Sequence, residues 1–220
     1  MKNLTLIFFI FSLLSYSQNN FTSARSIEIS ENNYEEQLRS SIVKNIELTN
    51  IGPSVMSGRV TDLEVNPNNP TEFYVAYASG GLWHTKNNGT TFSPIMDNSM
   101  TQNIGDFAID WKSNSIYVGT GESNSSRSSY PGIGILKSND NGSTWSNIGL
   151  RDSHHISRVL VNPNNENHIV VAVIGHLYTK NTQRGIFTSF DNGKTWKKSL
   201  FINDHTCLLY TSPSPRDTRE

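Results

Sequence analysis

The sequence predicts an all-β protein, a β-propeller fragment of about three four-stranded blades. An eight-residue stretch recurs with its glycines at 89, 142 and 193, in steps of 53 and 51 residues. A fixed period of this length is typical of repeat architectures. Each repeat also holds four strand-like runs, which is the layout of a propeller blade. The 15 glycines and the abundant Asn, Ser and Thr suit a fold that is dense in turns.

The first 46 residues are expected to lie outside the blades. Residues 1–17, MKNLTLIFFIFSLLSYS, carry a lysine, a short apolar run and a Ser-Tyr-Ser site, which together predict a secretory signal peptide. The mature chain is therefore expected in the periplasm, at the cell surface or in the medium, with no transmembrane segment. Residues 18–46 are polar and poorly patterned, and we interpret them as a spacer. Within it, 34–46 could form a short helix.

The blades are predicted over 47–206. In the second repeat the four strand-like runs are FAIDW, SIYVGTG, GIGILKS and TWSNIG. Three blades cannot close a ring, since propellers typically have four to eight. The stretch TNIGP at 49–53 resembles SNIGL at 146–150, which is an outer strand. We therefore expect 49–53 to supply the outer strand of the last blade of a larger ring.

The recurring stretch reads TKNNGTTF, SNDNGSTW and SFDNGKTW in the three repeats, and we call it the repeated turn. Asn-Gly at its tip supplies the positive φ angles of a tight two-residue hairpin turn. The preceding Asp or Asn can accept backbone N–H bonds, and Thr and Trp suit the returning strand. A calcium loop is excluded, because Lys137, Asn139 and Ile148 occupy positions that would need acidic ligands. The residues predicted to build the turn are Thr85, Asn87, Gly89 and Phe92; Ser138, Asp140, Gly142, Thr144 and Trp145; and Ser189, Asp191, Gly193, Thr195 and Trp196.

The repeated turn resembles the Asp-box, or BNR, repeat S-x-D-x-G-x-T-W. That repeat occurs in sialidases, several glycoside hydrolases and sortilin-type propellers. The second and third copies match it fully, and the first departs at Thr85, Asn87 and Phe92. The stretch from about 47 to 204 is similar to secreted bacterial BNR-repeat proteins, often labelled glycosyl hydrolase or sortilin-like. The resemblance implies a propeller in which the boxes are structural, but a fold does not fix an activity.

Length variation indicates where ligands bind. The segment from the second-strand valine to the third-strand glycine spans 6, 16 and 14 residues in the three repeats, from Val75, Val118 and Val171. Antiparallel alternation places these loops and the blade-to-blade loops on one end of the blades, opposite the repeated turns. We call this end the loop face. Variable loops on one face of a repeat array often form its binding surface.

Glu122 and Arg127 are the first candidates on the loop face. A carboxylate and a guanidinium could contact a polar ligand; alternatively they form an exposed pair that only shapes the loop. Histidines of this face could form a metal site, but no metal-type spacing is present, so surface histidines are the default and no metal or cofactor is expected. The candidate ligand-face residues are Glu122, Asn124, Arg127, His154, His155, His176 and Tyr178.

Two function classes remain open. One is a secreted module that binds an extracellular protein, peptide or glycan, as the sortilin-type resemblance implies. The other is a glycoside hydrolase of the BNR-repeat type acting on extracellular polysaccharide, which usually needs two carboxylates about 5–10 Å apart. Glu122 is one candidate, and Asp97, Asp106 or Asp152 could be the second. We favour the binding module. A net charge of −1 gives no basic footprint for nucleic acid.

The last residues, 207–220, break the repeat pattern. The stretch CLLYTSPSPRD at 207–217 resembles an in-frame translation of a transposon-type sequencing adapter. We expect 207–220 to be a non-native tail and the chain to be a fragment. Cys207 is the only cysteine and lies in this tail, so no disulfide is expected in the blades.

Overall fold

The computed structural model of the chain describes residues 21–46, 58–124 and 129–205. Several predicted features lie outside these residues: the signal peptide at 1–17, the outer strand at 49–53, Arg127 and the tail at 207–220. In the described part, no helix is both long and apolar enough to cross a membrane.

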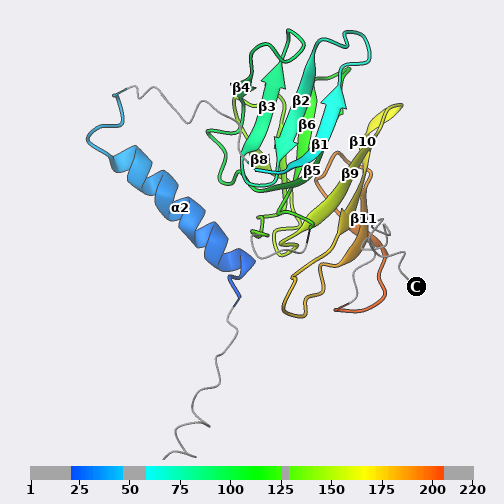
Figure 1. Cartoon of the computed structure of the whole chain (residues 1–220). Helices are drawn as coiled ribbons and strands as arrows, with labels where there is room; N and C mark the ends of the chain where they lie inside the picture. The colour runs from blue at the N-terminus through cyan, green and yellow to red at the C-terminus, as the bar shows by residue number, and fades with distance from the viewer. Residues whose placement is uncertain (1–20, 47–57, 125–128, 206–220) are drawn as a thin grey trace, which may run out of the picture.

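The described part of the chain forms three four-stranded antiparallel sheets, each built from four consecutive strands in sequence order (Figure 1). The prediction of an all-β fold with about three four-stranded blades is confirmed. The strands of the first sheet are β1 (Val60–Val65), β2 (Phe73–Tyr77), β3 (Gly81–Thr85) and β4 (Ser93–Pro94). Those of the second are β5 (Ile104–Asp110), β6 (Ser115–Thr120), β7 (Ile135–Ser138) and β8 (Ser146–Asn147). Those of the third are β9 (Ile156–Asn162), β10 (Asn165–Val173), β11 (Gly185–Ser189) and β12 (Lys197–Leu200).

The core lies between neighbouring sheets, which pack against each other. One cluster of buried apolar side chains joins the first two sheets and includes Leu82, Met96 and Phe107. A second cluster joins the second and third sheets and includes Tyr117 and Ile169. Every residue of the central strand β6 is buried because the second sheet is covered on both faces. Burying such apolar surface is the main favourable term in holding the blades together.

The first strands of the three sheets lie side by side, β1 against β5 and β5 against β9. Register makes three charged residues of these strands structurally equivalent. Asp62 pairs with Ala76, Asp106 with Gly119, and Arg158 with Ala172. Two acids and one arginine therefore occupy the same position in successive blades.

The repeated turns are held by their own hydrogen bonds. In the second blade, the Ser138 hydroxyl donates to Asp140 Oδ1 (2.7 Å) and accepts from the Gly142 amide (2.8 Å). The amide and hydroxyl of Thr144 donate to the same carboxylate, at 2.8 and 2.6 Å. Ser189, Asp191, Gly193 and Thr195 repeat this arrangement in the third blade.

The Asn and Gly at each tip have positive φ, as the Asn-Gly pair predicts. In the second blade the values are +56° for Asn141 and +88° for Gly142. However, the prediction of a tight two-residue hairpin was wrong. The first ladder pair beyond the turn is Lys137 with Ser146, so eight residues separate the paired strands. The extra residues are needed because the Asp140 carboxylate occupies the middle of the turn.

Tryptophan at the end of the repeated turn links one blade to the next. Trp145 Nε1 donates to the Ile95 carbonyl (3.1 Å), and Trp196 Nε1 donates to the Ile148 carbonyl (2.7 Å). The first copy has Phe92 at this position. Its ring packs edge-on against Phe73 within the same blade, with 5.9 Å between centroids. Only the two full copies can form the indole bond between blades.

The repeated turns lie beside the turns between the first and second strands, as alternation predicts. The Asn88 amide donates to the Thr71 carbonyl (2.8 Å), and the Asn192 amide donates to the Asn167 carbonyl (3.0 Å). The segments between the second and third strands therefore lie at the opposite end of each blade, the loop face.

A helix, α2 (Ala24–Ser40), precedes the blades. It begins ten residues before the segment 34–46 in which a short helix was expected, because Ser23 caps its start by accepting from the Ser26 amide. Its first half contacts the blades: Ile27 packs against the first apolar cluster and Glu31 pairs with Arg151 at 2.7 Å. The remainder extends away from the sheets (Figure 1).

Candidate ligand site on the loop face

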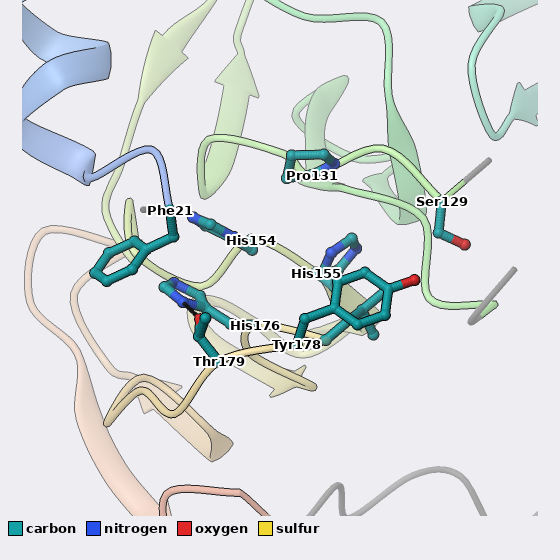
Figure 2. Close-up of a pocket in the computed structure, with 9 residues that line it drawn as sticks. Phe21, Ser129, Pro131, His154, His155, His176, Tyr178 and Thr179 are labelled. Carbon is teal, nitrogen blue, oxygen red and sulfur yellow. Dashed lines mark hydrogen bonds between the residues drawn. The ribbon is translucent and has the colours of Figure 1, made fainter. Parts of the chain in front are cut away.

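A pocket of about 490 Å³ opens on the loop face. Three segments build it: the loop after β6, the connection that leads into β9, and the loop after β10. Phe21, three residues before the start of α2, supplies a fourth wall (Figure 2). The lining residues are Phe21, Ser129, Pro131, His154, His155, His176, Leu177, Tyr178 and Thr179. Four of the seven candidate ligand-face residues, three histidines and a tyrosine, therefore meet in one pocket.

Two exposed tyrosines belong to the loops that build the pocket. Tyr178 lines the pocket and is 78% exposed. Tyr130, which lies in sequence between the lining residues Ser129 and Pro131, is 53% exposed. Figure 2 shows the Tyr178 ring at the opposite end of the pocket from Phe21. An exposed tyrosine offers an apolar face and a hydroxyl at low conformational cost, which suits recognition of another molecule.

The three histidines are buried, so the expectation of surface histidines was wrong. His154, His155 and His176 are only 8%, 3% and 2% exposed. The N-terminal segment covers two of them, His154 and His176. The Phe21 ring lies 4.8 Å from the His176 ring, and the Thr22 carbonyl accepts from His154 Nε2 at 3.2 Å.

Hydrogen bonds fix the orientation of each imidazole. His155 Nδ1 lies 2.8 Å from the Glu122 carbonyl oxygen, and His176 Nδ1 lies 2.7 Å from the Thr179 hydroxyl. The rings of His154 and His176 stack with 3.6 Å between centroids. His176 Nε2 lies 3.4 Å from Asp152 Oδ1, although that nitrogen is buried and makes no hydrogen bond.

Burial keeps two of these imidazoles neutral. It lowers the pKa of His155 to about 4, because the charged form would lose its water. Burial also lowers the pKa of His154, and the neighbouring His176 ring lowers it further. Neutral imidazoles can act as hydrogen-bond acceptors or metal ligands in the pocket.

Glu122 is buried rather than exposed, which corrects its interpretation as an open ligand contact. Gly121, with φ of +85°, turns the chain at the end of β6, and the Glu122 side chain is then only 1% exposed. Its carboxylate accepts from Arg59 Nε at 2.7 Å and also from Arg59 Nη2. The expected partner, Arg127, lies outside the described residues. Asn124 is exposed, and its carbonyl accepts from the Ser129 hydroxyl.

The other acidic candidates lie in three different settings. Asp97 is exposed after β4. Asp106 is buried on β5, where its carboxylate accepts from the Val159 amide at 2.7 Å and lies 3.3 Å from Arg158. Asp152 lies beside His176. The carboxyl groups of Asp106 and Asp62 are close enough to share a hydrogen bond, and burial together with Asp62 raises the pKa of Asp106 to about 8.

Arg184 holds the loop after β10 in shape. Its guanidinium donates to the carbonyls of Ile174 (2.6 Å), His176 and Thr179 (3.2 Å). Sequence reasoning missed this residue as well as Phe21 and Thr22. Arg184 could have been noticed as a charged residue just before a predicted strand. Nothing in the local pattern of Phe21 indicates a contact with a loop more than 150 residues away.

Comparisons with known proteins bear on the fold. No family model and no curated protein matches the chain. Among solved structures, an ancestral GH74 enzyme superposes with a TM-score of 0.56 at 21% identity over 73% of this chain. A GH74 xyloglucanase from Xanthomonas campestris gives 0.45 at 14% over 62%, and YCF48 from Cyanidioschyzon merolae gives 0.43 at 18% over 69%.

The likeness to the ancestral GH74 enzyme shows the fold alone. The chain spans 21% of that enzyme, 21% of the xyloglucanase and 40% of YCF48. Together with the three four-stranded sheets, the comparison supports a β-propeller fragment whose ring is not closed by the described residues.

Proposed function

We propose that this chain is part of a secreted Asp-box β-propeller whose loop face binds an extracellular ligand, either a protein or peptide segment or a glycan. The observation that carries the proposal is the pocket of about 490 Å³ with Tyr178 exposed at its edge. Its volume falls within the range of small-ligand sites, and its walls combine apolar rings with a few polar groups.

The Asp-box assignment rests on the repeated turns. Both full copies place a serine hydroxyl, a carboxylate and a threonine in the same hydrogen-bonded arrangement. Secretion rests on the sequence of residues 1–17. Removal of that segment would make Phe21, which lines the pocket, the fourth residue of the mature chain.

The geometry favours binding over glycoside hydrolysis. A glycosidase needs one carboxyl group that gives up a proton and a second that stays ionised. Glu122 was the first candidate, but its carboxylate is buried and accepts two hydrogen bonds from the Arg59 guanidinium, and Glu122 is not among the pocket residues. Asp106, whose raised pKa would suit an acid, lies on the inner strand β5 beside Asp62 and not among the pocket residues.

A screen of immobilised glycans and peptides tests the proposal. The purified protein should retain members of one class, and the retained ligand should be recovered unchanged after prolonged incubation. Cleaved glycan in the recovered material would contradict the binding proposal and indicate that the protein is a hydrolase. Failure to retain any glycan or peptide would reject the loop-face ligand site.

A further inference from the structure

We propose that Asp152, His154 and His176 form a binding site for one divalent transition-metal ion, of which zinc is the probe. The site goes beyond the proposed function, because it does not depend on which ligand the pocket takes. One carboxylate oxygen and one nitrogen of each imidazole lie within 4.8 Å of one another. Two histidines and a carboxylate are a ligand set that zinc and neighbouring metals prefer.

His176 provides the observation that points to a missing ligand. Its side chain is 2% exposed, and its Nε2 is buried without any hydrogen-bond partner. An unsatisfied buried polar atom is costly, so native proteins rarely leave one unpaired. Nδ1 of the same ring is already bonded to the Thr179 hydroxyl at 2.7 Å. Nε2 faces the Asp152 carboxylate at 3.4 Å, and it carries the lone pair that a metal needs when Nδ1 is the protonated nitrogen.

The second hydrogen bond of each imidazole matches what metal ligands require. A ligating histidine commonly donates its other N–H to a carbonyl, carboxylate or water, which fixes its tautomer. His154 Nε2 donates to the Thr22 carbonyl, which leaves the lone pair on Nδ1. In the tautomer in which His176 Nδ1 donates to the Thr179 hydroxyl, the lone pair is on Nε2.

The ligand atoms must close around the ion, and the stacked rings of His154 and His176 must tilt so that a lone pair of each points at it. Zinc binds nitrogen and oxygen at about 2.0–2.2 Å in tetrahedral geometry, which spaces its ligands roughly 3.4 Å apart. The Asp152 oxygen and His176 Nε2 already lie at 3.4 Å. Asp152 and His154 are only two residues apart in a connecting segment, so their atoms can approach without disturbing a strand. Three protein ligands leave a fourth position for water or for an atom of a bound ligand.

The alternative is a site without metal, in which His176 Nε2 donates to the Asp152 carboxylate. Zinc titration by calorimetry separates the two, using protein that carries no histidine tag and has been dialysed against a chelator. We expect one zinc per chain, and a cobalt(II) complex with the absorption of a tetrahedral site. Asp152→Asn and His176→Ala should each weaken zinc binding roughly 100-fold, and Thr179→Val about 10-fold.

His168→Ala is the matched control, because His168 is a partly buried histidine of the same blade that stacks on Phe190 at the other end of β10. It should bind zinc as the unchanged protein does. If His176→Ala fails to fold, Asp152→Asn still decides, since Asp152 is partly exposed. Absence of stoichiometric zinc binding, or equal binding in Asp152→Asn and the unchanged protein, would overturn the proposal.

Discussion

The Glu122 carboxylate accepts two hydrogen bonds from the guanidinium of Arg59, a residue 63 positions earlier in the chain. The acid is buried, at 1% exposure, whereas the arginine side chain remains 49% exposed. Arg59 precedes β1 of the first blade, and Glu122 follows β6 of the second. The pair therefore ties two blades together on the loop face, next to the carbonyl of Glu122 that orients His155.

Replacing Arg59 alone should lower the thermal stability more than replacing Arg59 and Glu122 together. Arg59→Met leaves the buried Glu122 carboxyl group without the guanidinium that binds it, whereas Arg59→Met combined with Glu122→Gln leaves a neutral amide there. We expect the thermal midpoint of the double variant to lie about 3 °C or more above that of Arg59→Met. Arg39→Met is the control, because its ion pair with Glu35 on α2 is exposed and should contribute little. Equal midpoints for the single and double variants would contradict a stabilising inter-blade pair.

The repeated turns should stabilise the fold only while their carboxylates are ionised. Hydrogen bonds from threonine and serine lower the pKa of Asp140 and Asp191 to about 2, from 3.8. A lowered pKa in the folded state adds stability above the unfolded pKa, and that stability is lost as pH falls from about 4 to about 2. In Asp140→Asn/Asp191→Asn, the loss of stability relative to the unchanged protein should be full at pH 6 and shrink toward pH 2. Denaturant unfolding at a series of pH values measures it, and a difference independent of pH would count against the hydrogen-bonded carboxylates.

Asp106 should make the folded protein less stable as the pH rises, the opposite of the effect of Asp140 and Asp191. Burial and the adjacent Asp62 raise its pKa to about 8, so the folded protein keeps a proton that the unfolded chain releases near pH 4. The free energy of unfolding should therefore fall as pH rises from about 4 to about 8. Urea midpoints at pH 5 and pH 8 should differ by roughly 1–3 M in the unchanged protein.

Asp106→Asn should remove that pH dependence. The amide oxygen can still accept from Val159 and the amide nitrogen can donate to Asp62, so the variant should be the more stable protein at pH 8. A variant that keeps the full decline between pH 5 and pH 8 would show that another group is responsible.

The indole bond between blades predicts a modest cost for Trp196→Phe. The replacement keeps an aromatic ring but leaves the Ile148 carbonyl without its donor at 2.7 Å. We expect a loss of about 1 kcal/mol in the free energy of unfolding, measured by urea denaturation. Phe92→Tyr in the first blade is the comparison, because the phenylalanine there makes no such bond and the change should be close to neutral. Equal losses in the two variants would argue that ring packing, not the indole bond, matters.

The blade architecture could be predicted because it depends on local signals that recur. Asn141 and Gly142 favour a turn, and the apolar runs on either side predict strands. The step of about 50 residues gives the length of one blade. Strand alternation then placed the variable loops on one face correctly. The length of the turn was underestimated, because the bonds to Asp140 need more residues than a two-residue hairpin provides.

The site was only half predictable, because its decisive contacts join residues far apart in sequence. The histidines and Tyr178 were placed on the right face by loop position alone. Phe21 covers His154 and His176, and the Glu122 carboxylate binds Arg59; no spacing rule connects these residues. A metal site among the histidines was considered and set aside because they lack metal-type spacing, and His154 and His176 approach only when two loops meet.

The most direct test of the loop-face account compares two exposed aromatic residues at opposite ends of the third blade. Tyr178 lies at the pocket, and Phe190, 66% exposed, lies in the repeated turn. Isothermal titration should measure the affinity of a glycan or peptide retained by the protein for Tyr178→Ala and Phe190→Ala. We predict a loss of about 10-fold for Tyr178→Ala and none for Phe190→Ala. Weaker binding by Phe190→Ala with unchanged binding by Tyr178→Ala would place the ligand on the other face and contradict the account.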